Sequence, residues 1–133
     1  YLARGSARMT PRDELTALAD MIDAAERAME YIAGTTLDAL PSDRMRSDAI
    51  LRVLGVLGEA GARVSQETRQ RFPLLPWREM KGMRNVLIHR YDQIAWPIVW
   101  DTVTIHIPAM MPALREAHQQ ISSEQPTQPP ETP

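Results

Sequence analysis

The sequence has no cysteine among its 133 residues, few aromatic side chains and no long apolar run. Without cysteine the chain can form no disulfide, thiolate metal site or cysteine nucleophile. No stretch approaches the roughly 20 apolar residues that span a bilayer, and the N-terminal residues lack the apolar core of a secretory signal. These absences predict a cytoplasmic protein with no membrane role.

Histidine is also scarce, and the three histidines form no metal-binding pattern. His106 and His118 are 12 positions apart, and neither has a second ligand at helical spacing. Zinc sites usually draw several ligands from short, characteristic spacings. We therefore expect no metal site and no other cofactor.

A chain of this length forms one domain, and its composition changes at both ends. Residues 1–8 precede Met9 and are expected to be a tag remnant. Residues 9–121 are expected to form the domain. Residues 122–133 are rich in proline and polar residues, so they are expected to be disordered, with the P-x-x-P from Pro126 to Pro129 inert.

Apolar residues recur at helical spacing in four segments, and no strand is evident. Thr10 is the expected N-cap of the first helix and Pro11 its first residue. Pro108 and Pro112 are expected to kink the last helix. The sequence thus predicts an all-α, up-and-down four-helix bundle whose helices span about 11–34, 44–65, 77–90 and 94–121.

Glycine repeats every three residues at Gly55, Gly58 and Gly61 in the second predicted helix. A phosphate-binding loop would need a strand before it, and none is visible. Small residues that let two helices approach closely are the better interpretation. Glu59 lies within this run and is expected to pair with an arginine, for which Arg84 is our candidate.

Charge is unevenly distributed along the chain, although the net charge is only −2. Residues 12–30 carry four more acids than bases, so the first helix should not face phosphate. Residues 78–92 carry two more bases than acids. This polarity favours an anionic ligand at the second of these segments.

Arg84, His89 and Tyr91 surround an otherwise apolar turn, residues 86–88. Arginine offers a planar fork of donors that suits phosphate, and histidine can exchange protons near neutral pH. The combination suits phosphodiester chemistry. The structural alternatives are an ion pair for Arg84, a helix-capping role for His89 and a half-buried interface phenol for Tyr91.

Helical geometry limits how these residues can act together. Residues five apart, such as Arg84 and His89, differ by about 140° around an ideal helix, whereas Arg84 and Tyr91 differ by about 20°. Either the helix unwinds near His89, or the arginine curls round, or a second copy completes the pair. We favour a dimer with local unwinding.

The chain resembles the HepT-like toxins of the HEPN ribonuclease superfamily from about Leu15 to Leu114. The resemblance rests on an Arg-x4-His-x-Tyr motif and on several short motifs in the family's order. These are Gly58-Glu59-Ala60, Phe72-Pro73, Pro76-Trp77, Gly82-Met83-Arg84-Asn85, Ile88-His89, Tyr91 and Trp100. Arg-x4-His alone would be a weak signal, but the combination is much stronger.

The resemblance implies a homodimeric, metal-independent endoribonuclease toxin of a type II or type VII toxin–antitoxin pair. Arg84 and His89 of each protomer would face each other across a dimer cleft, and the ribose 2′-OH would attack the adjacent phosphorus. Asn85 would support this site by orienting His89 or contacting phosphate. The competing interpretation is a catalytically inert helical dimer that only binds a nucleotide or a protein.

The resemblance also implies a partner, an MNT-type nucleotidyltransferase antitoxin. This enzyme would attach AMP to Tyr91 and so silence the nuclease, because a bulky negative group repels and obstructs RNA. Arg90 departs from the glycine that many relatives carry at this position. Its side chain could add a phosphate contact or narrow access to Tyr91, which puts the ease of modification in doubt.

Overall fold

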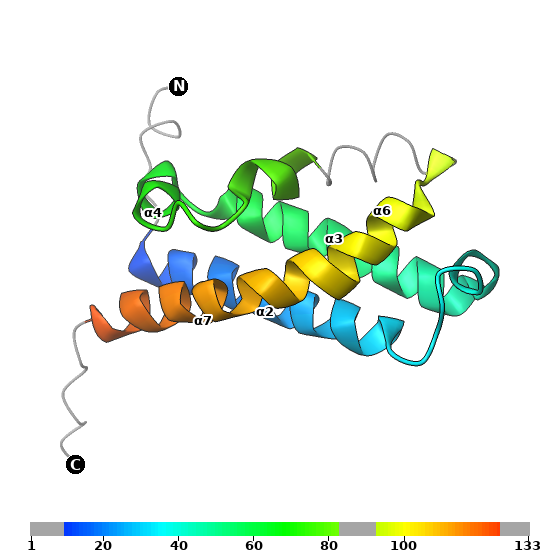
Figure 1. The fold of residues 1–133 in the computed structure, drawn as a ribbon. Coiled ribbons are helices and arrows are strands. Elements are labelled where there is room, and N and C mark those ends of the chain that lie inside the picture. Colours follow the sequence, from blue (N-terminus) through cyan, green and yellow to red (C-terminus); the bar gives the residue numbers. More distant parts are fainter. Residues whose placement is uncertain (1–9, 83–92, 126–133) are drawn as a thin grey trace, which may run out of the picture.

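The computed structural model describes residues 10–82 and 93–125, which consist of helices and connecting turns with no strand (Figure 1). Within these residues no helix is long and apolar enough to cross a membrane. The prediction of an all-α helical bundle is confirmed. In chain order the elements are α2 (Pro11–Ile32), η1 (Leu40–Ser42), α3 (Arg44–Arg63), α4 (Gln66–Arg71), α6 (Trp96–Asp101), η3 (Thr102–His106) and α7 (Ile107–Ser123). A further helix begins at Trp77 and includes Gly82, the last described residue before the gap.

Helix α2 begins where the sequence predicts. The Thr10 hydroxyl accepts a hydrogen bond from the Asp13 amide at 3.1 Å, and the Asp13 carboxylate accepts one from the Thr10 amide at 3.2 Å. Pro11 occupies the first turn, where its missing N–H costs nothing. The hydrogen bond from the Thr10 side chain is the main cause that lowers the pKa of Asp13 below its usual value. The start of α2 is therefore specified locally.

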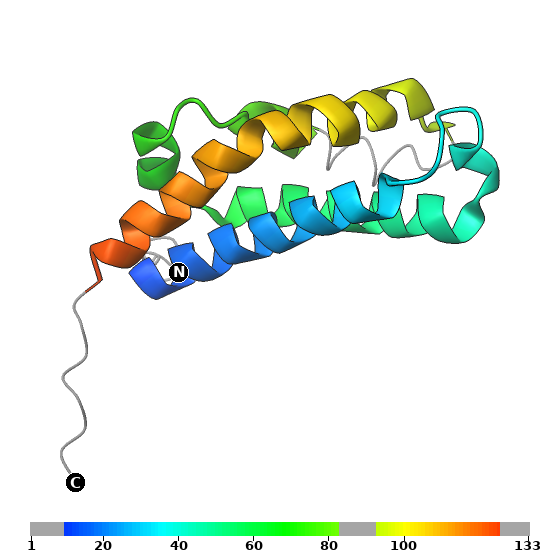
Figure 2. The same ribbon diagram turned by 60° about the horizontal axis from the view of Figure 1, so that its bottom comes forward.

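The core lies between α2, α3 and the helix that ends in α7, and α2 packs against both of the others (Figures 1 and 2). Helical spacing in the sequence predicts that six apolar residues between Ile50 and Val64 point inward, and all six are buried. In α2 the buried face is centred on alanines and Met21, and Leu15, Ile22 and Met29 are only partly buried. Small side chains on this face allow the two neighbouring helices to approach. These six inward-pointing residues are Ile50, Val53, Leu54, Leu57, Ala60 and Val64, and Leu51 of α3 is buried as well.

The connection after α3 contains a short helix, α4, that the sequence does not predict. The Ser65 hydroxyl caps it by accepting a hydrogen bond from the Thr68 amide at 3.2 Å. Farther along, the Trp77 indole Nε1 donates to the Phe72 carbonyl at 2.9 Å. Both hydrogen bonds join residues within the connection, so they stabilise its local conformation.

The fourth predicted helix forms as α6, η3 and α7 in succession, and η3 is a π-helical turn just before Pro108. Proline has no N–H, and its ring clashes with the carbonyl of the fourth preceding residue, here Thr104. The hydroxyls of Thr102 and Thr104 donate to the Ile98 and Trp100 carbonyls, both at 2.7 Å. Such hydrogen bonds commonly bend helices. The disturbance expected from proline thus lies at residues 102–106, while Pro112 sits inside α7.

The helical domain extends beyond its predicted end at Ile121. Helix α7 continues to Ser123, and the Glu124 carboxylate pairs with the Arg71 guanidinium at 2.5 and 3.0 Å. Residues 122–125 therefore belong with the bundle because an ion pair to α4 holds them there. Residues 126–133, the rest of the segment expected to be disordered, lie outside the described residues.

Candidate functional site

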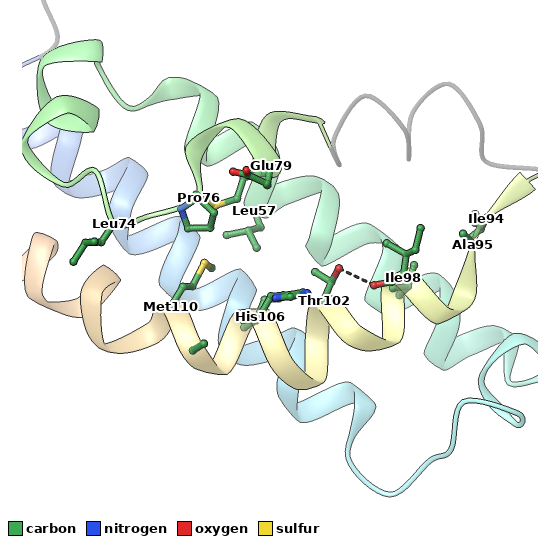
Figure 3. Close-up of a pocket in the computed structure, with 14 residues that line it drawn as sticks. Leu57, Leu74, Pro76, Glu79, Ile94, Ala95, Ile98, Thr102, His106 and Met110 are labelled. Atoms are coloured by element: carbon green, nitrogen blue, oxygen red, sulfur yellow. Dashed lines mark hydrogen bonds between the residues drawn. The ribbon is translucent and has the colours of Figure 1, made fainter.

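An apolar groove of about 650 Å³ runs between the helix that begins at Trp77 and the α6–α7 helix (Figure 3). Leu57 of α3 also lines it. Leu74 and Ile98 are exposed at the groove, so it carries apolar surface in contact with solvent. The remaining lining residues are Pro76, Glu79, Met80, Ile94, Ala95, Val99, Thr102, His106, Ile107, Ala109 and Met110.

A second, more polar cavity of about 440 Å³ lies where the beginning of α3 meets the residues that lead into α6. The α3 side supplies Arg44, Ser47, Asp48 and Leu51. The other residues that line it are Pro41, Gln93, Ile94 and Trp96. Our reading of the sequence missed this cavity, because its walls come from segments more than 40 residues apart and share no motif.

The motif segment, residues 83–92, joins the two sides of the apolar groove along the chain and directly precedes Gln93 of the polar cavity. Arg84, Asn85, His89, Arg90 and Tyr91 all lie outside the described residues. The residues that flank the segment are described: Glu79 and Met80 line the apolar groove before it, and Ile94 lines both cavities after it. Both cavities therefore adjoin the part of the chain that carries the predicted catalytic residues.

Glu59, the predicted supporting carboxylate, is exposed on α3. Its candidate partner Arg84 lies outside the described residues, so the ion pair stays a prediction. The neighbouring glycines lie inside α3, which excludes a phosphate-binding loop there. A Cβ on Gly61 would stand 3.6 Å from Met21 Cε, whereas one on Gly55 would meet nothing within 4 Å. The close helix contact predicted for the glycines thus holds at Gly61 and fails at Gly55.

The described residues include the acidic stretch of α2 but only the beginning of the predicted basic segment 78–92. Asp20, Asp23 and Glu26 of α2 pair with Arg63, Arg27 and Arg115, respectively, so part of the acidic face is neutralised. The first of these pairs is the shortest, with Arg63 Nη2 2.6 Å from Asp20 Oδ2. Arg78 and Lys81 are exposed just before the motif segment. Cationic side chains therefore precede the motif segment, while several α2 carboxylates are already paired.

No group of three or more acidic, histidine or cysteine side chains among the described residues could hold a metal ion. His106 is exposed at the apolar groove, and His118 is partly buried on α7. Around the two cavities, the described residues offer a ligand guanidinium, carboxylate, amide, imidazole, hydroxyl and aromatic groups.

Comparison with known proteins defines the class of this helical bundle as ribonuclease. The family model described as "Ribonuclease HepT-like" matches residues 21–117, which include the motif segment. The chain belongs to the HepT-like ribonuclease family. This confirms the resemblance drawn from the sequence motifs.

Individual relatives agree with the family match. A protein of Methanocaldococcus jannaschii, named as a candidate RNase, is 32% identical over 75% of this chain and 92% of its own length. A candidate RNase of Caldanaerobacter subterraneus subsp. tengcongensis is 30% identical over 80% of this chain and 93% of its own. A probable ribonuclease HepT of Thermococcus cleftensis is 31% identical over 70% of this chain and 84% of its own. No solved structure gives a significant match to the chain.

Proposed function

We propose that this protein is a metal-independent endoribonuclease that uses Arg84 and His89. The observation that carries the proposal is the family match over residues 21–117, because that range contains the complete Arg84-x4-His89-x-Tyr91 motif. Relatives named as RNases, matched over most of their own length, support the same activity. Exposed Arg78 and Lys81 beside the motif add positive charge suited to an RNA backbone.

In the proposed reaction His89 takes the proton of the ribose 2′-OH, and that oxygen attacks the adjacent phosphorus. The bond from phosphorus to the 5′-oxygen breaks, and the leaving oxygen takes up a proton. The products are a 2′,3′-cyclic phosphate and a 5′-OH. Arg84 stabilises the negative charge that develops on the phosphate oxygens, and Asn85 and Arg90 contribute further polar contacts. Glu59 acts as a positioning residue for Arg84.

The proposed active form is a homodimer in which each protomer supplies Arg84 and His89 to one cleft. Exposed apolar side chains at the groove beside the motif segment support this proposal, since a second copy would remove them from water. Ile98 of α6, which lines the groove, is 67% exposed, and Ile105 of η3, about two turns farther along the chain, is 56% exposed. Leu74 on the opposite side of the groove is 90% exposed.

The proposed biological role is that of a toxin in a type II or type VII toxin–antitoxin pair. An MNT-type nucleotidyltransferase would be its antitoxin and would transfer AMP from ATP to the Tyr91 hydroxyl, with release of pyrophosphate. The added phosphate would repel RNA and obstruct the cleft. Incubation with the enzyme encoded next to this gene and ATP should add the mass of AMP to the wild-type protein and not to Tyr91→Phe.

The activity is tested with purified, partner-free protein and total RNA in EDTA, beside Arg84→Ala and His89→Ala. Removal of a general base typically lowers the rate by about 10²–10⁴-fold, and we expect His89→Ala to fall in this range. Arg52→Ala on α3 and His118→Ala on α7 are matched controls that should cleave at the wild-type rate. Sedimentation must first show that all five proteins form the same folded oligomer.

The ends of the RNA fragments distinguish the possible outcomes. Cyclic-phosphate ends produced by wild type and both controls, and lost in the two motif variants, would support the nuclease. Equal cleavage by all five proteins would identify a contaminant. No cleavage by any of them, when mass spectrometry finds no modification, would favour a helical module that only binds its ligand.

A further inference from the structure

Exposed apolar side chains follow one side of the helix that runs through α6, η3 and the beginning of α7. Ile98, Ile105 and Ala109 are exposed, and Thr102 between them is half-buried. We call these four residues the isoleucine face; Figure 3 shows Ile98 and Thr102 in succession on this helix. They are separated by four, three and four positions, the spacing with which one helix packs along another. A contiguous apolar surface of this kind marks an interaction site.

Two polar side chains are exposed within the same stretch of helix, those of Asp101 and His106. Neither forms a hydrogen bond or an ion pair with another described residue. An imidazole donates a hydrogen bond to a carboxylate whether it is neutral or protonated. The stretch therefore offers one acceptor and one donor that have no partner within the described part of the chain.

We propose that a second copy of this chain docks on the isoleucine face in antiparallel orientation, so that this face is the interface of the homodimer. The proposal rests on the proposed function, since that function requires a homodimer. The two-fold axis passes level with the bond between residues 103 and 104. Each Ile105 then faces the partner's Thr102. Each Ile98 faces the partner's Ala109.

Side-chain size supports this register. Each isoleucine of one copy meets a smaller side chain of the other, so the two faces interdigitate instead of colliding. The Thr102 hydroxyl already donates a hydrogen bond to the Ile98 carbonyl at 2.7 Å, so burying it leaves no unpaired donor. The apolar side chains leave water when the two copies meet, which favours association.

Charge complementarity favours a second copy as the partner and determines its orientation. In the same register each Asp101 faces the partner's His106, and this pair forms twice in the dimer. A two-fold axis parallel to the helix would instead bring the two Asp101 carboxylates opposite each other, and like charges opposed across an interface are unfavourable. Because both complementary groups lie on one helix, an antiparallel copy satisfies both at once.

The register is tested by disulfide trapping in the full chain, which has no cysteine of its own. An equimolar mixture of Ile98→Cys and Ala109→Cys should form a disulfide-linked dimer on mild oxidation. Ile98→Cys alone should not, because its two copies would lie roughly 15 Å apart along the helices and a disulfide needs Cα atoms within about 7 Å of each other. Ala109→Cys mixed with Glu30→Cys, which is exposed on α2, is the matched control and should not link.

Sedimentation equilibrium measures what the apolar and the charged groups contribute. Ile105→Asp should weaken dimerisation at least about tenfold, because it places an unpaired charge in the interface. Met45→Asp introduces the same charge at an exposed apolar position of α3 and should leave dimerisation unchanged. Asp101→Arg should also weaken dimerisation about tenfold, because the cation faces the partner's His106. Adding His106→Asp to Asp101→Arg should restore dimerisation to within about threefold of wild type.

Three results would overturn the proposal: no disulfide-linked dimer in the mixture, equal linking in Ile98→Cys alone, or no rescue of Asp101→Arg by His106→Asp. A wild-type protein that sediments as a monomer would overturn it as well, and would leave the isoleucine face to a different protein.

Failure of this proposal is distinguishable from failure of the proposed function, because none of these measurements depends on RNA cleavage. Trapping as expected, with no cleavage by the wild-type protein, would retain the interface and remove the nuclease. Loss of cleavage in His89→Ala, with no trapping in the mixture, would retain the nuclease and remove this interface. Thermal unfolding of each variant verifies that it is folded.

Discussion

The carboxylate of Glu14, in the first turn of α2, accepts hydrogen bonds from the backbone amide of Ser65, 51 residues along the chain, at 3.0 and 3.3 Å. Glu14 is only 6% exposed, and Ser65 is the N-cap of α4. A carboxylate is well placed there, because the N-terminus of a helix carries partial positive charge. This contact joins the start of α2 to the junction between α3 and α4.

Glu14→Ala should destabilise the fold, since it leaves the Ser65 amide without its acceptor. An unsatisfied buried donor costs about 1–3 kcal/mol, and because Ser65 is partly buried we expect a loss at the lower end of this range. Glu14→Gln keeps one side-chain oxygen as an acceptor and should cost less. Urea unfolding measures both, with Glu30→Ala on the exposed face of α2 as the control. A Glu14→Ala protein as stable as this control would show that the contact contributes nothing.

The Arg71–Glu124 pair should make stability depend on pH in the acid range. The hydrogen bond from Arg71 lowers the pKa of Glu124 in the folded state. A carboxyl with a lowered folded-state pKa stabilises the fold above its ordinary pKa, and this contribution disappears as pH falls through the folded-state value. The melting temperature of wild type should therefore exceed that of Glu124→Gln near pH 7, and the two should converge as the pH falls below the lowered pKa of Glu124.

The size of this difference should be small, because both side chains are largely exposed and solvent screens the pair. Glu30→Gln, which removes an exposed carboxylate from α2, is the reference for the effect of losing a charge. If the difference in melting temperature between wild type and Glu124→Gln stays constant across the acid range, the Arg71–Glu124 pair is not the cause of the pH dependence.

Replacing two of the glycines by alanine should change the stability of the protein in opposite directions. Gly34 has a φ of 82°, a left-handed conformation that disfavours alanine by about 1–2 kcal/mol. Gly55 lies inside α3, and a Cβ added there would meet nothing within 4 Å. At this position alanine should stabilise the protein by about 0.5–1 kcal/mol, because it restricts the unfolded chain and favours the helix. Chemical denaturation of Gly34→Ala and Gly55→Ala tests both signs; a shift in the same direction would refute the argument.

Alanine substitutions at two apolar residues of α3 should differ in their effect on stability, because one residue is buried and the other is exposed. Leu54 is fully buried, and Leu54→Ala should lower the free energy of unfolding by about 2–5 kcal/mol through lost contacts and a cavity. Met45 is 88% exposed on the same helix, and Met45→Ala should change stability by less than about 0.5 kcal/mol. Urea denaturation curves with equal slopes would establish that the comparison is between folded states of similar compactness. Similar losses in the two variants would contradict the assigned core.

Several features could be predicted from the sequence because their causes are local. The Thr10–Asp13 capping pair lies within one helical turn, and the spacing of Ile50, Leu54 and Leu57 marks the buried face of α3 without any knowledge of its partners. The family could also be predicted, since short motifs in a fixed order are a property of the sequence. The roles of Arg84, His89 and Tyr91 stay predictions that follow from that family and from side-chain chemistry.

Only the tertiary structure determines the features that depend on contacts between residues far apart in the chain. No local sequence pattern predicts the hydrogen bond between Glu14 and Ser65 or the ion pair between Arg71 and Glu124. That ion pair extends the domain past Ile121. The buried face of α2 is rich in alanine because two helices pack against it at once. The polar cavity is lined by Arg44 and Gln93, which are remote from each other in the chain. Such contacts depend on how packed helices bring remote side chains together, which periodicity within a single helix does not encode.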